Sequence, residues 1–166
     1  MECTVLVLGI GNTLLSDDGV GVHVIRALEE SRSAQGHLEI SPDEREPVRL
    51  RDAGTVGLAL LPEIAAAESL IVVDAANFGG APGEVQLFEA ENMDAMLGRS
   101  RLTPHEISLS DLVSAAKLTQ SLPARRALVA IQPADTALGL DPTTPVAAAI
   151  PVASNAVSDI IERWLT

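Results

Sequence analysis

Four ionisable side chains stand where an α/β protein could use them for chemistry. Asp17 and Asp18 follow a short apolar run, Asp74 ends another such run, and His105 comes directly after a proline. Two carboxylates and an imidazole together suit a divalent transition metal, because carboxylate oxygen is a hard ligand and imidazole nitrogen a borderline one. These residues are therefore the first candidates for a metal-binding site.

Each candidate also has a structural interpretation. An aspartate in the first turn of a helix often serves the cap and the helix dipole, which applies to Asp17 or Asp18 taken alone. Asp74 precedes a run of turn residues and can start that turn, while His105 can simply be exposed. Two aspartates in succession exceed what capping needs, which keeps the chemical interpretation open.

Short apolar runs predict the strands that would position these residues. We expect parallel strands at residues 4–9, 47–52, 69–74 and 126–131. A further strand near Val85 follows a turn-rich stretch too short for a crossover helix, which predicts an antiparallel strand. The expected fold class is α/β, a single domain over residues 1–166 with a doubly wound, mostly parallel five-stranded sheet, one antiparallel strand and helices on both faces.

The order of the strands decides which candidates meet. In a doubly wound sheet of order 2-1-3, the first and third strands are neighbours and a crevice opens between their carboxyl ends. Asp18 and Asp74 should then face each other across it. Asp52 and Gln132 end two other strands at the same edge, although Asp52 is equally suited to cap the turn that follows it.

Two helix positions follow from local patterns. Thr103, Pro104 and Glu106 predict a helix with Thr103 as its N-cap, because proline suits the first helical position and glutamate the third. A short helix after the second strand is predicted to bury Leu58, Leu61 and Ile64.

Composition excludes several classes of function. The 166-residue chain has a formal net charge of −12 and 2% aromatic residues, so nucleic acid is not an expected partner. No apolar run approaches the roughly 18 residues of a membrane span and no leader is visible, so we expect a cytoplasmic monomer without membrane contact. The one cysteine, Cys3, is expected to pack in the sheet rather than to act as a nucleophile.

Common catalytic signatures are missing. Leu14 stands where a dinucleotide-binding turn needs its third glycine, which disfavours a nicotinamide enzyme. The chain also lacks a His-Glu-x-x-His motif, a Gly-x-Ser-x-Gly motif and a phosphate-binding P-loop.

Several blocks resemble one known family. The segment from Gly9 to Gly21 resembles the N-terminal signature of the hydrogenase maturation proteases, which trim the large-subunit precursor of nickel-iron hydrogenases. The blocks at residues 52–55, 73–75 and 104–111 resemble later blocks of that family in the same order. Ala53 departs from the usual Asp-Gly-Gly-Thr sequence of the second block.

The resemblance implies a function and a set of site residues. It implies an endopeptidase that removes the C-terminal extension of the precursor after nickel insertion and uses the bound nickel as its recognition signal. Asp18, Asp74 and His105 would be the catalytic and metal-contacting residues. The nickel cofactor would be supplied by the precursor, which is the expected partner.

Two other interpretations stay open at this point. A phosphoacceptor receiver domain shares the strand order and an aspartate ending the third strand, but it needs a lysine where this chain has Gln132. The only lysine is Lys117. A small-molecule metallohydrolase with the same three ligands and a permanently bound metal is the other alternative.

Overall fold

The computed structural model of the chain describes residues 3–34, 46–55, 57–99 and 108–166. Its strands are β1 (Cys3–Ile10), β2 (Glu46–Gly54), β3 (Ala67–Ala75), β4 (Val85–Glu89) and β5 (Arg125–Ile131). Its α-helices are α1 (Val20–Ala34), α2 (Leu61–Ala65), α3 (Ala90–Arg99), α4 (Leu109–Leu118) and α5 (Thr144–Leu165). Two short 3-10 turns, η1 (Ser16–Gly19) and η2 (Leu58–Leu60), precede α1 and α2.

The strands of the described chain form one five-stranded sheet of order β2-β1-β3-β5-β4. β1 runs parallel to both β2 and β3, and β3 runs parallel to β5. β4 is the antiparallel strand and pairs with β5, with Val85 opposite Ile131. The predicted fold class, the parallel strands and the antiparallel strand near Val85 are confirmed.

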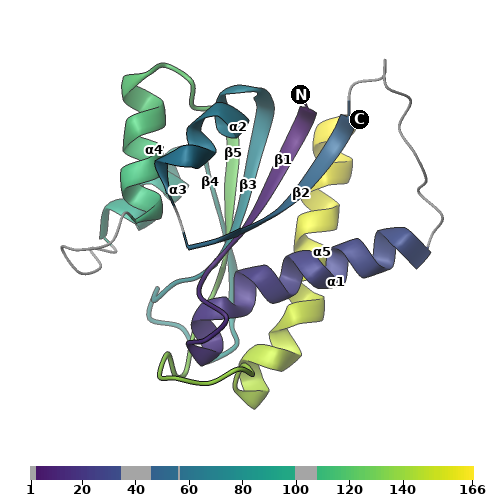
Figure 1. Cartoon of the computed structure of the whole chain (residues 1–166), viewed down its shortest axis with the longest axis vertical. Helices are drawn as coiled ribbons and strands as arrows, with labels where there is room; N and C mark the ends of the chain where they lie inside the picture. The colour runs from purple at the N-terminus through teal and green to yellow at the C-terminus, as the bar shows by residue number, and fades with distance from the viewer. Residues whose placement is uncertain (1–2, 35–45, 56, 100–107) are drawn as a thin grey trace.

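Helices cover both faces of the sheet (Figure 1), and α2, α3 and α4 lie on one side while α1 and α5 lie on the other. Alternate residues of β1 enter different cores, with Leu6 and Leu8 on the α4 side and Val5 and Val7 on the α1 side. All four are completely buried. Burial on both faces explains why the central strands are continuous apolar runs.

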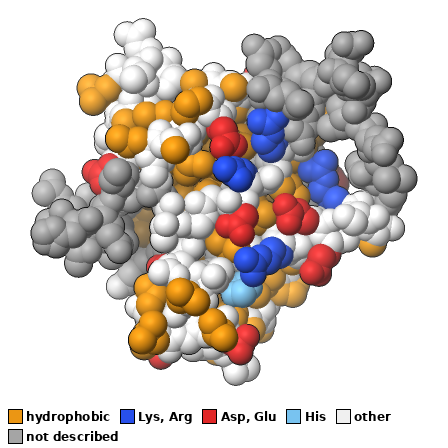
Figure 2. Space-filling model, viewed as in Figure 1, with side chains coloured by type: hydrophobic (Ala, Val, Ile, Leu, Met, Phe, Trp, Pro, Cys, Tyr) orange, Lys and Arg blue, Asp and Glu red, His pale blue; other side chains and the backbone are white. Residues whose placement is uncertain are grey.

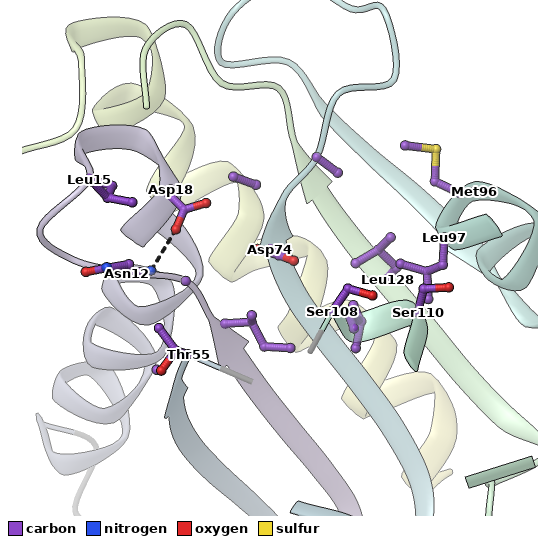
Figure 3. Close-up of a pocket in the computed structure, with 16 residues that line it drawn as sticks. Asn12, Leu15, Asp18, Thr55, Asp74, Met96, Leu97, Ser108, Ser110 and Leu128 are labelled. Atoms are coloured by element: carbon purple, nitrogen blue, oxygen red, sulfur yellow. Dashed lines mark hydrogen bonds between the residues drawn. The ribbon is translucent and has the colours of Figure 1, made fainter. Parts of the chain in front are cut away.

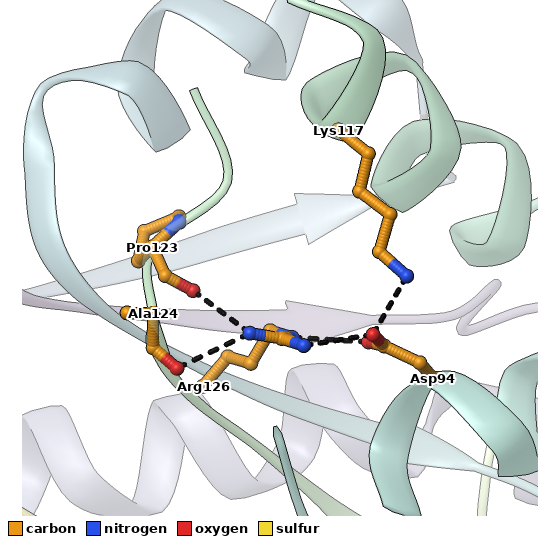
Figure 4. Close-up of polar contacts among 5 residues, drawn as sticks. All are labelled: Asp94, Lys117, Pro123, Ala124 and Arg126. Carbon is orange, nitrogen blue, oxygen red and sulfur yellow. Dashed lines mark hydrogen bonds and ion pairs between the residues drawn. The ribbon is translucent and has the colours of Figure 1, made fainter. Parts of the chain in front are cut away.

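An ion cluster joins α3 and α4 to the sheet (Figure 4). The Asp94 carboxylate accepts hydrogen bonds from Arg126 Nε at 3.0 Å and Nη2 at 2.7 Å, and Lys117 Nζ lies 2.6 Å from it. The Arg126 and Asp94 side chains are only 12% and 17% exposed. Because the guanidinium binds the carboxylate with two parallel hydrogen bonds, this cluster fixes the position of α3 beside β5.

The two local helix predictions are confirmed only in part. The helix expected from Thr103 begins at Leu109, because Ser108 Oγ accepts from Asp111 N while the Asp111 carboxylate accepts from Ser108 N. This reciprocal cap satisfies two backbone donors. The predicted cap residues Thr103, Pro104 and Glu106 lie outside the described residues. The short helix after β2 is present as α2 and buries Ile64 completely. Leu58, however, is 49% exposed, because a 3-10 turn precedes α2 and Leu60 is buried in its place.

Helix α3 was not predicted from the sequence at all. Its buried side chains, Met93, Met96 and Leu97, lie at i, i+3 and i+4, a helical spacing that spans little more than one turn and was overlooked. The helix is stabilised by packing against α4, β4 and β5. Tertiary contacts therefore decide this element, and they bring Met96 and Leu97 to the edge of the sheet where the site lies.

Helix α5 is long and apolar enough to cross a membrane by length and composition. In this fold it packs against α1, β4 and β5. Its buried stripe consists of Val146, Ala149, Ala153, Val157 and Ile160. The helix therefore packs one apolar stripe against the sheet and α1, and its length and composition are weak evidence for a membrane segment.

Gly21 allows α1 to approach the sheet closely. A Cβ atom at this position would overlap the carbonyl oxygens of Ile10 and Val73. Since both oxygens belong to the backbone, neither can move aside cheaply.

We expect Gly21→Ala to lower the free energy of unfolding by about 1–3 kcal/mol through overpacking. Gly98→Ala is the matched control, because Gly98 is also helical and a Cβ there meets open space. That change should stabilise the protein by about 0.5–1 kcal/mol, since alanine favours helix over glycine. Urea unfolding of both variants measures the difference, and equal effects would contradict the close packing of α1.

Candidate active site

A cavity of about 450 Å³ opens at the carboxyl ends of β1 and β3. Its wall includes the turn after β1, the end of β2 and β3, helix α3 and the start of α4 (Figure 3). Asp18 and Asp74 are the charged side chains among the described residues that line it. The remaining wall is mostly apolar, with Leu15, Met96 and Leu97 among its side chains.

Asp18 enters the cavity from η1. Its backbone N–H donates to Leu15 O at 3.0 Å, which tightens the turn. Its Oδ2 atom accepts from Asn12 N at 2.8 Å (Figure 3). This hydrogen bond fixes the carboxylate over the end of β1 and leaves Oδ1 without a hydrogen bond to the described residues.

Asp74 reaches the same cavity from the carboxyl end of β3. Burial, and after it the nearby Asp18 carboxylate, raise the pKa of its carboxyl from 3.8 to about 8, while a hydrogen bond from the Ala75 backbone opposes the change. The side chain is half-buried and remains accessible from the cavity. The structure thus brings two carboxyl groups to one cavity in mutual repulsion, as the strand order predicts.

The third candidate, His105, lies outside the described residues. Among the residues that the structure does describe, no group of three or more histidine, cysteine, aspartate or glutamate side chains could hold a metal ion. The described part of the site therefore provides two carboxyl groups, those of Asp18 and Asp74. The role of His105 stays a prediction that rests on the family resemblance.

Asp17 has a structural role, unlike its neighbour Asp18. Its side chain is completely buried. Its Oδ2 atom accepts from Ala134 N at 2.8 Å, Asp135 N at 2.9 Å and Thr143 Oγ1 at 2.9 Å, and Oδ1 accepts from Thr143 N at 2.6 Å. These hydrogen bonds lower the pKa of Asp17 although burial acts in the opposite direction. The carboxylate therefore anchors the segment before α5 and does not face the cavity.

The other polar residues at this edge serve turns. Asp52 Oδ1 accepts from Gly54 N at 3.0 Å, so the turn-capping interpretation holds. Gln132 Oε1 accepts from the backbone N–H groups of Phe78 and Gly80, at 3.0 and 3.2 Å, and so fixes the loop after β3. Lys117 is paired with Asp94 in the ion cluster. A receiver-like site, which needs a lysine near Asp74, is therefore not favoured.

The structure adds Ser108, Ser110, Met96 and Leu97 to the cavity wall. The Ser108 hydroxyl donates to Asp111 Oδ2 at 2.8 Å and is thus used in the helix cap. Ser108 and Ser110 belong to a block that already resembled the family sequence. Met96 and Leu97 lie on helix α3, which sequence reasoning missed although Met93, Met96 and Leu97 have the spacing of a helical face.

Comparisons with known proteins agree on one family. A family model described as hydrogenase maturation protease matches residues 22–160. The chain is 34% identical over 142 residues to the hydrogenase 2 maturation protease of Escherichia coli K12, covering 84% of this chain and 80% of that protein. It is 36% identical over 131 residues to the hydrogenase expression/formation protein HupD of Rhodobacter capsulatus, covering 79% of this chain but only 58% of HupD.

A solved structure supports the same assignment. The hydrogenase maturating endopeptidase HybD from E. coli superimposes with a TM-score of 0.80 at 32% identity, covering 96% of this chain and 93% of that chain. The sheet and the cavity at its carboxyl edge define a doubly wound α/β protein with a two-carboxylate site. The chain belongs to the hydrogenase maturation protease family, and the resemblance seen in its sequence is confirmed.

The raised pKa of Asp74 predicts a pH-dependent stability. Between the unfolded value of 3.8 and the folded value of about 8, the folded protein keeps a proton that the unfolded chain loses. The free energy of unfolding therefore falls as pH rises across this window. Asp74→Asn should be more stable than the wild type at pH 8, by about 1–3 kcal/mol given the solvent access of the side chain. Urea unfolding between pH 4 and 8 should show this difference shrinking towards pH 4, and a constant difference would contradict it.

The two neighbouring aspartates should respond differently to the same change. Asp17→Asn puts an amide where an oxygen accepts several buried hydrogen bonds, so we expect a loss of about 2–4 kcal/mol in the free energy of unfolding. Asp18→Asn is the matched control, because its described contact is one hydrogen bond, and it should cost about 1 kcal/mol or less. Chemical denaturation at pH 7 measures both. A similar loss in both variants would argue against the anchoring role of Asp17.

Proposed function

We propose that this protein is an endopeptidase that removes the C-terminal extension of a nickel-iron hydrogenase large-subunit precursor after nickel insertion. Membership of the hydrogenase maturation protease family supports a peptidase that acts in hydrogenase processing. The chain spans 58% of the length of one relative, HupD, and the activity of the whole protein is part of the proposal.

One observation carries the proposal: Asp18 and Asp74 share a cavity in which no described lining residue is a lysine or arginine. Two carboxylates facing each other repel, and a divalent cation between them would offset this repulsion. Carboxylate oxygen together with imidazole nitrogen is a suitable donor set for a divalent metal of the nickel type. Asp18 and Asp74, together with His105, therefore form a donor set that fits the ion that the family resemblance implies.

We propose that the nickel is recognised within the substrate. Asp18 and Asp74, with His105 as the third ligand, would bind the nickel that the precursor presents at the cavity. A divalent ion so placed can polarise a carbonyl group and lower the pKa of a bound water. Asn12 positions the Asp18 carboxylate through its backbone N–H, and the apolar wall formed by Leu15, Met96 and Leu97 would limit the access of bulk water.

The proposed setting of the enzyme follows from its charge and its substrate. A chain of net charge −12 repels nucleic acid, so the expected partner is the precursor protein and not a nucleic acid. We propose that the enzyme acts as a monomer in the cytoplasm. Sedimentation of the purified protein tests the monomer.

Processing of the precursor tests the function. We expect the purified enzyme to release the C-terminal extension from nickel-loaded precursor and not from nickel-free precursor, with release followed by mass spectrometry. His105→Ala should weaken binding of the loaded precursor at least tenfold, because one of three metal ligands is lost. His23→Ala is the matched control, since His23 lies on α1 and does not line the cavity.

Each contrary result has its own meaning. Equal release from both precursors would overturn recognition of nickel while leaving the peptidase in place. No release from either would overturn the proposed function. An enzyme that is purified with one metal ion per chain and cleaves neither precursor would favour the small-molecule metallohydrolase.

A further inference from the structure

Three exposed leucines lie together beside the candidate active site. Leu14, Leu138 and Leu140, here called the leucine rim, are 56%, 86% and 71% exposed. Figure 2 shows hydrophobic side chains gathered at the end of the molecule where Figure 1 places the start of α1 and the loop before α5. A surface of this kind on a well-packed domain indicates contact with another molecule.

Backbone hydrogen bonds join the two segments of the rim. Gly139 N donates to Leu14 O at 2.9 Å, and Ser16 N donates to Gly139 O at 2.8 Å. Ser16 Oγ fills the space that a side chain at Gly139 would need. The inner side of this segment is therefore occupied, and the leucines on both sides of Gly139 remain directed to solvent.

The buried Asp17 carboxylate holds the rim in place from below. It accepts hydrogen bonds from the residues at both ends of the segment 134–143. A surface fixed in this way loses little conformational entropy when it binds, which favours affinity. Segment 134–143 is held rigid by the buried Asp17 carboxylate and exposes leucines to solvent. It therefore has the properties of a preformed docking surface.

The rim is continuous with the cavity. Leu14 precedes Leu15, which lines the cavity and pairs with Gly139 in an isolated β-bridge. The same 3-10 turn that donates to Gly139 also carries Asp18. A polypeptide that presents a metal between Asp18 and Asp74 therefore lies next to the rim.

Charge identifies the partner's chemistry. Asp135 and Asp141 are exposed on the same segment, and residues 134–143 contain no lysine or arginine. A second copy of this chain, with the same net charge of −12, would be repelled. An apolar segment accompanied by lysine or arginine side chains would be attracted.

We infer that the leucine rim docks an apolar, lysine- or arginine-bearing segment of the precursor that lies outside its metal-binding part. This inference rests on the proposed function, because it takes the hydrogenase precursor as the substrate. It adds a second contact that is independent of the nickel ligands. The rim would align the precursor so that its metal enters the cavity.

The test is a double variant, Leu138→Ser with Leu140→Ser, assayed on nickel-loaded precursor. We expect KM and the dissociation constant to rise at least tenfold while kcat and the melting temperature stay close to those of the wild type. Leu118→Ser is the matched control, because Leu118 is also 86% exposed but lies at the end of α4. It should change none of these values.

Asp141→Asn tests the charge separately. Association with the precursor should slow by a few-fold at low salt, and the difference should disappear at high salt because exposed charges are then screened. An unchanged association rate at low salt would overturn the inference that the partner segment carries lysine or arginine side chains.

The outcomes separate the inference from the function on which it rests. If the wild type cleaves loaded precursor and the double leucine variant binds and cleaves it equally well, the rim is not a docking surface and the proposed function stands. If the wild type does not cleave, the function fails, and equal binding of the precursor to wild type and variant overturns the rim as well. A wild-type dimer that the double change converts to a monomer would instead make the rim a contact between copies and overturn the inference.

Discussion

The buried carboxylate of Asp17 is the interaction on which the rest of the site depends. It joins the turn after β1 to the segment before α5, two parts of the chain more than 115 residues apart in sequence. An ionised group without solvent contact is costly unless hydrogen bonds satisfy it, and here four of them do so. Removing that anchor would free both the turn that carries Asp18 and the segment that carries the leucines.

In the site, an aspartate side chain has the opposite environment: Asp74 lacks the hydrogen bonds that satisfy Asp17. Burial and the nearby Asp18 carboxylate raise the pKa of Asp74 to about 8 against a single backbone hydrogen bond, whereas the hydrogen bonds to Asp17 lower its pKa despite burial. Structural and functional carboxylates are often distinguished in this way, because a binding site keeps its groups unsatisfied until the ligand arrives. The strain of two neighbouring acids is a stability cost that the surrounding core can tolerate.

Apolar side chains buried on both sides of the sheet offset this loss of stability. β1 and β3 contribute apolar side chains to both helical layers, and the Asp94 cluster ties the outer helices to β5. α3 is the element that closes the cavity on the side away from Asp18, and its position follows from this cluster and from its packing on β4. The rigid parts of the protein thus lie directly behind the groups that would bind the substrate.

The sequence by itself determined the sheet, because buried strands read as apolar runs and the turn-rich stretch before Val85 is too short for a crossover helix. It also placed Asp18 and Asp74 at one edge, since parallel strands end together. Tertiary structure decided the rest. Only long-range hydrogen bonds show that Asp17 is an anchor while Asp18, held by Asn12 N, faces the cavity, and only packing brings α3 to the site. Local patterns describe one turn of chain at a time, whereas these features depend on residues that meet from distant segments.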